Sequence, residues 1–104
     1  MNNPKIDANG NKHWYNKQGQ LHRTDGPAAE HANGTKYWYQ NDRRHRLDGP
    51  AIEYTNGNKC WYIRGQRHRL DGPAVEYASG DKCWFIHGRE LTEAEHLLLT
   101  FVTV

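Results

Sequence analysis

The stretch that decides the fold is residues 56–77, which read NGNKCWYIRGQRHRLDGPAVEY. Similar stretches stand at residues 9–31 and 33–54, and a shortened one stands at residues 79–91. Self-similarity at a fixed period of this length is the sequence signature of a repeat architecture. We therefore expect residues 1–104 to form a single domain of about 3.5 stacked units.

The tryptophans give the period of the repeat. Trp38, Trp61 and Trp84 follow one another at intervals of 23 residues, whereas Trp14 precedes Trp38 by 24. The first unit thus carries one extra residue, which we place near its second turn.

Each unit has the turn chemistry of a β-hairpin. The dipeptides Asn9-Gly10, Asn33-Gly34 and Asn56-Gly57 accept positive φ at both central positions of a tight turn, and Ser79-Gly80 is a weaker version. Strand-prone runs such as Ala-Val-Glu-Tyr and Lys-Cys-Trp-Tyr flank these dipeptides. A second turn is expected at Gly19, Gly65 and Gly88, and at Asn41-Asp42 in the second unit. The fold class is therefore mainly β, an antiparallel, solenoid-like meander of hairpins with a 23-residue period.

Period-two alternation assigns the faces of the sheet. It places Cys60 and Tyr62 on one face, and Lys59 and Trp61 on the other. In the preceding strand, Ile52 shares a face with Tyr54, opposite Ala51 and Glu53. We expect an aromatic–aliphatic face built from the first set and a face of Trp with cross-strand Lys–Glu pairs built from the second.

The C-terminus changes period and predicts a short helix over residues 92–102. Thr92 followed by Glu95 is a capping-box pattern, and the most apolar stretch of the chain comes next. A repeat array needs an end that does not stack further, so we expect this helix to cap the sheet. The alternative is that Leu97, Leu98 and Phe101 mediate dimerisation; an open sheet edge could do the same.

Composition narrows the class of protein. The chain has a formal net charge of +2, which by itself does not indicate nucleic-acid binding. No stretch resembles a signal peptide or could span a bilayer, so a cytoplasmic location is expected.

Cys60 and Cys83 occupy equivalent positions in adjacent units and could be neighbours across strands. In a cytosolic protein they are expected to be reduced.

A repeated His-Arg-x-Asp motif is the most suggestive chemical constellation. Histidine and aspartate ligate metals and perform acid–base chemistry, and a phosphate or small molecule could also bind there. Three equivalent copies argue against a catalytic centre, which normally brings different residues together at one place. We favour a structural role in which Asp accepts from backbone amides of the Gly-Pro bend, while His and Arg stack between units. The copies are His22-Arg23-Thr24-Asp25, His45-Arg46-Leu47-Asp48 and His68-Arg69-Leu70-Asp71.

Signals of catalysis are missing from the sequence. It has no phosphate-cradling glycine loop, nucleophile elbow or zincin motif, and no closely spaced metal-ligand pairs. We expect a non-enzymatic protein without cofactor or metal. Tryptophan and arginine dominate protein interface hot spots, so they are the candidate partner-binding residues, although they could equally serve structure alone. The candidates are Trp14, Trp38, Trp61, Trp84, Arg43, Arg44, Arg64 and Arg67.

The string NG-x-K-x-WY-xx-G-x-x-HR-x-DGPA-x-EY resembles the divergent MORN-type repeats of bacterial antitoxin-like proteins. It is still more similar to short DGPA-repeat proteins of tailed phages, over residues 9–95. The resemblance implies a single-layer meander and an accessory protein that acts in the host-cell cytoplasm by binding and inhibiting a host or cognate protein. Its glycines are sparser than in standard MORN repeats, so lipid binding is not implied.

Two other functions remain open at this point. Basic and aromatic side chains in alternation would also suit a sponge for nucleotides or single-stranded nucleic acid. A homo-oligomeric structural spacer, joined through sheet edges or the terminal helix, is the third possibility.

Overall fold

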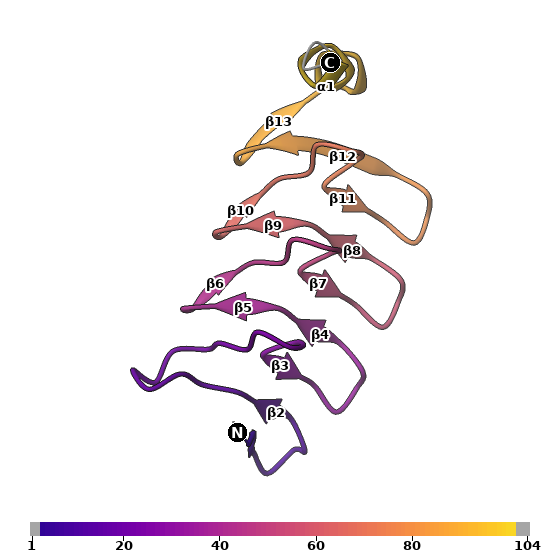
Figure 1. Ribbon diagram of the computed structural model, residues 1–104. Helices are drawn as coiled ribbons and strands as arrows, with labels where there is room; N and C mark the ends of the chain where they lie inside the picture. Colours follow the sequence, from indigo (N-terminus) through magenta and orange to yellow (C-terminus); the bar gives the residue numbers. More distant parts are fainter. Residues whose placement is uncertain (1–2, 102–104) are drawn as a thin grey trace.

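The computed structural model describes residues 3–101 as a thin, elongated, antiparallel β-array that ends in one helix (Figure 1). Its principal extents are 46 × 30 × 18 Å, so the chain forms a single layer of sheet rather than a closed barrel. The elements are β1 (Lys5–Ile6), β2 (Lys12–His13), β3 (Ala29–Glu30), β4 (Lys36–Tyr37), β5 (Tyr39–Gln40), β6 (Arg43–Arg44), β7 (Ile52–Glu53), β8 (Lys59–Cys60), β9 (Tyr62–Ile63), β10 (Gln66–Arg67), β11 (Val75–Glu76), β12 (Lys82–Ile86), β13 (Arg89–Leu91) and α1 (Glu93–Phe101).

The sheet is a meander, as predicted. Nine strands follow one another in the order β1-β2-β3-β4-β7-β8-β11-β12-β13, and all of their pairings are antiparallel. Two further hairpins, β5–β6 and β9–β10, extend from one side of this sheet as arms (Figure 1). The second and third units therefore each contribute two strands to the continuous sheet and one hairpin to the arm side, while the arm of the first unit holds a single bridge between Tyr15 and Leu21.

The Asn-Gly turns differ from the predicted two-residue type. At residues 55–57, Gly57 N–H donates to the Tyr54 carbonyl at 3.0 Å, and Tyr54 N–H donates to the Asn58 carbonyl at 3.0 Å. Among the loop residues only Gly57 has positive φ, 95°. This is a three-residue loop, a turn followed by one left-handed residue. The side-chain oxygen of Asn56 accepts a hydrogen bond from the Asn58 N–H, which explains why asparagine precedes the glycine.

The second turns are the ones with two positive-φ residues. Arg64 (50°) and Gly65 (83°) form such a pair, and Asn41 (51°) and Asp42 (67°) form another. The first unit uses a three-residue loop here, closed by Gly19 N–H donating to the Asn16 carbonyl at 3.0 Å. The extra residue of the first unit therefore lengthens this turn, where an insertion disturbs no strand.

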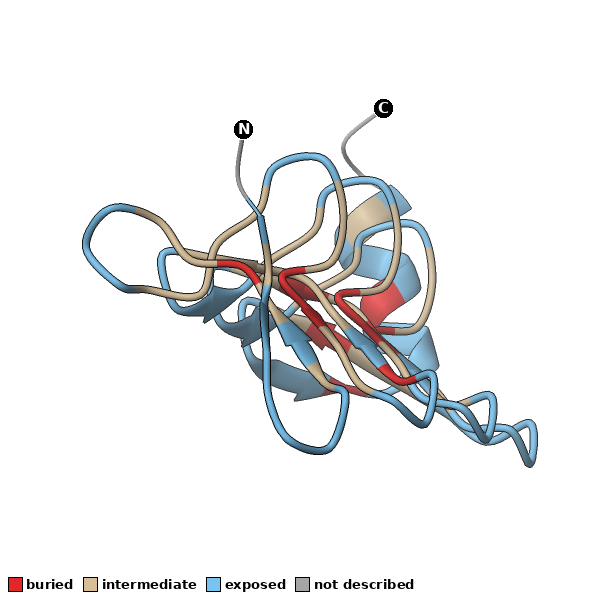
Figure 2. Cartoon of the chain, turned by 90° about the horizontal axis from the view of Figure 1, so that it is seen from below, coloured by how far each residue is buried: buried red, intermediate tan, exposed pale blue. Residues whose placement is uncertain are grey.

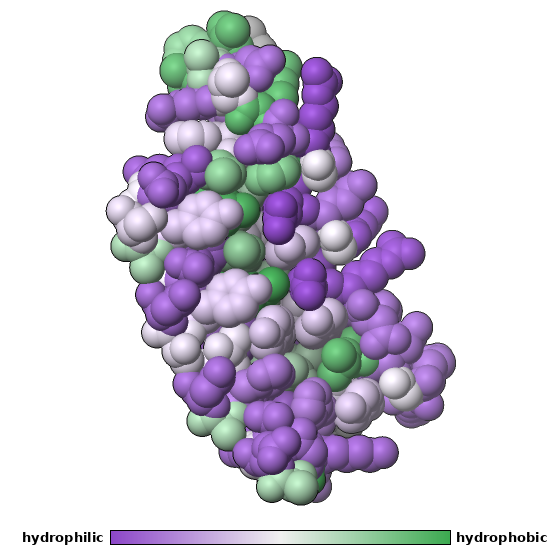
Figure 3. All heavy atoms as spheres, turned by 180° about the vertical axis from the view of Figure 1, so that it is seen from behind, coloured by the Kyte–Doolittle hydropathy of each residue, from purple (hydrophilic) through white to green (hydrophobic). Residues whose placement is uncertain are grey.

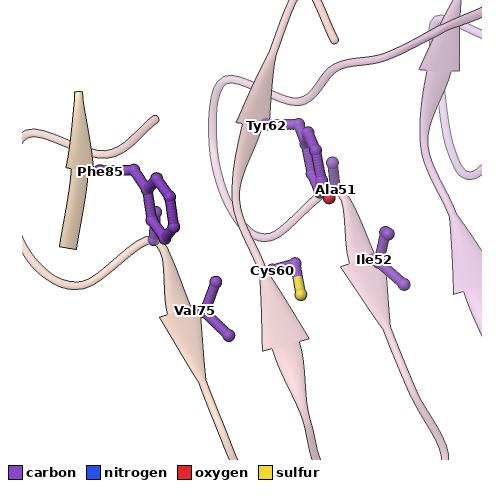
Figure 4. Packing of buried hydrophobic residues seen from close by; sticks show 7 residues of the cluster. Ala51, Ile52, Cys60, Tyr62, Val75 and Phe85 are labelled. Carbon is purple, nitrogen blue, oxygen red and sulfur yellow. The ribbon is translucent and has the colours of Figure 1, made fainter. Parts of the chain in front are cut away.

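The buried residues lie along the middle of the sheet (Figure 2). On one face, Ile52, Cys60 and Val75 lie side by side on paired strands, with Tyr62 and Phe85 packed over them (Figure 4). The alanines of the Asp-Gly-Pro-Ala motif are fully buried, and those of the second and third units belong to the same cluster. The cluster confirms the predicted grouping of Ile52, Cys60 and Tyr62, but it also contains Ala51, which alternation had placed on the opposite face. The buried alanines are Ala28, Ala51 and Ala74.

The two cysteines are not adjacent. Cys60 and Cys83 both pair with Val75, from the strands on either side of it, and both thiols are free. The cysteines are therefore not direct cross-strand neighbours, an arrangement that the sequence left possible, because each unit adds two strands to the sheet and Val75 lies between them. Burial raises the pKa of the Cys60 thiol, which makes it a poor nucleophile at neutral pH.

The C-terminal helix begins with the predicted capping box. Thr92 N–H donates to Glu95 Oε1 at 2.8 Å, and Glu95 N–H donates to Thr92 Oγ1 at 3.1 Å. The helix then runs from Glu93 to Phe101 and packs on β12 and β13 at the end of the array. Of the predicted range 92–102, the last residue lies outside the described part of the chain.

Candidate binding faces

Each His-Arg-x-Asp motif builds an arginine clamp, most clearly around Arg46. Its guanidinium carbon lies 3.8 Å from the ring centre of Trp38, a cation–π stack. Its Nε donates to Asp48 at 3.0 Å, and its Nη1 donates to the carbonyl of Pro50 and to Glu53, both at 3.0 Å. The guanidinium thus ties the Trp strand, the Gly-Pro bend and the following strand together. The equivalent clamps are Arg23 on Trp14 and Arg69 on Trp61.

The glycine of the motif is required by this clamp. A Cβ at Gly49 would lie 2.9 Å from the guanidinium carbon of Arg46, closer than any ordinary contact. The φ of Gly49 is not in the left-handed region, so the reason is close approach of the arginine and not backbone conformation.

Two expectations for this motif need correction. Asp48 binds the guanidinium of Arg46 instead of backbone amides, and Arg46 stacks on the Trp of its own unit instead of between units. Lys59 does face Glu53 in the register, but Glu53 forms its ion pair with Arg46. The planar guanidinium of Arg46 lies flat on the indole and can donate to two carboxylates and a carbonyl at once. The ammonium group of a lysine such as Lys59 lacks this planar geometry.

The histidine of each motif joins consecutive units. Arg64 N–H donates to Nδ1 of His45 at 2.9 Å, and His87 N–H donates to Nδ1 of His68 at 2.9 Å. In the first unit, Asn41 N–H donates to Nδ1 of His22 at 3.1 Å. In all three pairs the amide belongs to the first positive-φ residue of the second turn in the next unit. This histidine thus links consecutive units, as expected, and it does so by a hydrogen bond. Because Nδ1 accepts that bond, it must be unprotonated.

These contacts predict that acid weakens the array. Burial lowers the pKa of both His45 and His68, helped by the charge of Arg64 near the first and by His87 and His96 near the second. The unfolded chain then binds more protons than the folded chain once the pH falls below about 6.5, the ordinary pKa of histidine. Stability is therefore fully present above that pH and declines as the pH falls through it.

The measurement is the melting temperature between about pH 7.5 and 5.5, a window above the ordinary pKa of carboxylates. We expect it to fall toward the acid end. A His45→Ala/His68→Ala double variant should be less stable at the upper pH but should show a flatter slope. Equal slopes in the two proteins would contradict this assignment.

The tryptophans do not form an exposed ladder. Trp14 is buried, and Trp38, Trp61 and Trp84 are half-buried. None of the ring pairs formed within residues 3–101 joins two tryptophans. Arginines cover the first three indoles, and α1 lies against the fourth, where the motif is missing.

Open hollows separate the successive motif loops on this side. One of about 730 Å³ lies between the loops of the second and third units, over Trp61, and one of about 600 Å³ lies over Trp38. Beside α1, the corresponding hollow over Trp84 measures only about 270 Å³. Trp38, Trp61 and Trp84 therefore line these hollows and do not form a protruding surface.

The opposite face presents tyrosines with arginines between them, and we call it the Tyr–Arg face. Arg44 lies 5.4 Å from the ring centre of Tyr62, and Arg67 lies 5.3 Å from that of Phe85. Arg67 Nε also donates to the Tyr62 hydroxyl at 3.2 Å. The tyrosines that follow the Ala-x-Glu run, Tyr54 and Tyr77, are 38% and 44% exposed. The Tyr–Arg face comprises Tyr39, Arg44, Tyr54, Tyr62, Arg67, Tyr77 and Phe85.

Charge distinguishes the two faces. On the motif side, Arg23, Arg46 and Arg69 are each neutralised by two carboxylates. On the Tyr–Arg face, neither Arg44 nor Arg67 forms an ion pair with any residue in the described range 3–101. The arginines of the Tyr–Arg face, unlike those of the clamps, therefore have no carboxylate partner in this part of the chain.

The predicted set of eight Trp and Arg candidates is thus divided by the structure. Arg44 and Arg67 belong to the Tyr–Arg face, while Arg43 and Arg64 line a hollow of about 480 Å³ at the tips of the second turns. The exposed tyrosines Tyr54 and Tyr77 were not among the candidates. Period-two alternation already placed Tyr54 on the same face as Tyr62, so this grouping could be predicted from the sequence. The exposure of the tyrosines could not, because it depends on the packing around them.

Two other features are absent from the described part of the chain. Residues 3–101 contain no cluster of three or more His, Cys, Asp or Glu side chains suited to a metal ion. They also contain no helix with the length and apolar character needed to cross a membrane. Comparisons with protein-family models, curated proteins and solved structures found no match to this chain.

Proposed function

We propose that this chain is a non-enzymatic protein-binding protein that uses its Tyr–Arg face to hold an acidic surface of a partner. The observation that supports the proposal is the pair of unneutralised arginines, Arg44 and Arg67, set among exposed tyrosines. Tyrosine and arginine are enriched at interface hot spots, and tyrosine provides a large contact area with little loss of rotamer entropy.

A protein partner fits this face better than single-stranded nucleic acid. Stacking of bases requires open aromatic faces. Tyr62 and Phe85 are only 7% and 8% exposed, and Arg44 and Arg67 already lie over them. The guanidinium groups can still donate to carboxylates at their edges, which is the geometry that an acidic protein surface offers.

The resemblance to phage DGPA-repeat and antitoxin-like proteins supports a more specific form of the proposal. The partner is then a host or cognate protein, and the chain inhibits it by masking the surface that it covers. A rigid single-layer array is suited to this task, because a preorganised surface loses little entropy on binding.

The test compares capture of a partner from bacterial lysate by two matched double variants. Arg44→Gln/Tyr54→Ala removes one cation and one large side chain from the Tyr–Arg face. The control, Arg43→Gln/Leu47→Ala, removes an exposed cation and an exposed apolar side chain from the opposite side. Arg43 and Arg44 are adjacent in β6, so their side chains point to opposite sides; Arg44 is paired with Tyr39 and Arg43 with Gln40.

We expect the first variant to lose at least about tenfold in affinity for the captured protein, and the second to bind like the parent chain. Nuclease treatment of the lysate separates the main alternative. If binding disappears after nuclease treatment, or if oligonucleotides raise the melting temperature, the nucleic-acid function replaces the one proposed. Equal binding by both variants removes the Tyr–Arg face as the interface.

A further inference from the structure

The helix α1 carries an apolar seam on its outer side. Ala94, Leu97, Leu98 and Phe101 stand at positions i, i+3, i+4 and i+7, the spacing of a stripe that normally faces a core. All four are exposed, with Leu97 at 62%, Leu98 at 69% and Phe101 at 70%. In Figure 3 the hydrophobic groups gather at the helical end of the array. We call these four residues the helix seam.

The side of α1 that faces the sheet is polar instead. His96 is 4% exposed, and its Nε2 lies 2.6 Å from the carbonyl oxygen of Arg69, to which it donates. Thr100, one turn later, is half-buried and lines the same hollow over Trp84 as His96. The helix is thus anchored through its polar side, and its apolar side chains remain largely exposed. Burial of such a seam against another apolar surface is favourable, because it removes large aliphatic and aromatic side chains from water.

We propose that the helix seam pairs with the same seam of a second copy of this chain, in an antiparallel helix–helix contact about a twofold axis. This inference is independent of the Tyr–Arg face and of the function proposed for it. It concerns the assembly in which that face is presented.

The order of side chains in the seam argues for a second copy as the occupant. In an antiparallel pairing centred between Leu97 and Leu98, Leu97 of one copy faces Leu98 of the other. Ala94 of one copy then faces Phe101 of the other. A small side chain opposite a large one at each end, with leucines between them, is the alternation that lets two helices interdigitate without voids. A twofold contact of this kind is self-complementary and closes at two copies.

Charge sets the direction of the pairing. The first turn of α1 carries Glu93 and Glu95, and its last turn carries no basic residue. A parallel pair would bring four carboxylates together at one end, whereas the antiparallel pair separates them and aligns the two helix dipoles favourably.

Leu70 lines the same hollow as Leu97 and is 57% exposed, so it enlarges the apolar surface at the edge of the seam.

The first experiment is sedimentation equilibrium of the full chain over a range of concentrations. We expect a monomer–dimer equilibrium, of modest affinity because nine-residue helices bury little area. Leu98→Glu should raise the dissociation constant at least about tenfold. The matched control is Leu99→Glu, since Leu99 is 53% exposed but lies off the seam; it should leave the dissociation constant nearly unchanged.

The second experiment tests the register with a small–large exchange. Ala94→Phe alone places two phenylalanines opposite each other, and Phe101→Ala alone places two alanines opposite each other, so each single variant should weaken the dimer. The double variant restores one large and one small side chain at each contact and should recover most of the affinity. A chain that stays monomeric at all concentrations overturns the proposal. So does equal weakening by Leu98→Glu and Leu99→Glu, or a double variant no better than the singles.

Discussion

Arg46→Ala is expected to lower the free energy of unfolding by about 3 kcal/mol, because it removes the guanidinium that joins an indole, two carboxylates and a carbonyl. The Arg46 side chain is only 21% exposed and that of Glu53 37%, so this carboxylate is left partly shielded from water, whereas Asp48, at 87%, is already solvated. Trp38 and Glu53 each lose their contact with this cation. Urea denaturation followed by tryptophan fluorescence measures the change.

Two companions make this result interpretable. Arg46→Lys keeps the charge but loses the planar fork, so it should recover less than half of the lost stability. Arg43→Ala removes an exposed arginine near the clamp and should change stability by less than about 0.5 kcal/mol. If Arg46→Ala cost no more than Arg43→Ala, the clamp would not be a determinant of stability.

Ile52→Ala is the second substitution with a large expected effect. Ile52 is 1% exposed and lies in the central strand β7 between Tyr37 and Cys60. Truncation of a buried isoleucine leaves a cavity and typically costs about 2–5 kcal/mol. A single-layer sheet has no second layer that could move in to fill the gap, so we expect about 3 kcal/mol. Urea denaturation again provides the measurement.

The control is the other isoleucine of the central repeats. Ile63 is half-buried and lines the hollow over Trp61, on the opposite face from Ile52. Ile63→Ala should cost less than about 1.5 kcal/mol, because water can occupy the vacated space at the edge of an open hollow. Similar costs for the two substitutions would show that the buried cluster of Figure 4 is not the principal core.

Much of the fold is local and could therefore be predicted from the sequence. The turn dipeptides, the alternation of Cys60 and Tyr62 with Trp61, and the capping box of Thr92 and Glu95 each act within a few residues. The structure bears out the meander, the shared face of Ile52, Cys60 and Tyr62, and the helix that follow from them. The turn type at Asn56-Gly57 was missed, because the same dipeptide serves both two-residue and three-residue loops and the register of the flanking strands decides between them.

The binding faces could be predicted only in part, because exposure depends on what covers a side chain. The repeated His-Arg-x-Asp was recognised as architectural, but its partners are several residues away in the chain or in the next unit. The spacing of Trp38 and Arg46 does not by itself show that the cation covers the indole. Hence the sequence pointed to the tryptophans as partner-binding residues. In the structure, the aromatic side chains that are exposed and lie near arginines without ion pairs are the tyrosines of the other face.

The sequence by itself determined the period, the antiparallel hairpins, the two sides of each strand and the start of the helix, because turn chemistry, side-chain alternation and capping are short-range effects. Only the tertiary structure decided which side chains neutralise each other, which rings are covered and which side of α1 faces the sheet. Those outcomes depend on contacts between units, such as His96 reaching the carbonyl of Arg69 across 27 residues of chain. The apolar spacing of the helix seam predicts a buried stripe, and the anchoring of His96 is what turns that stripe outward.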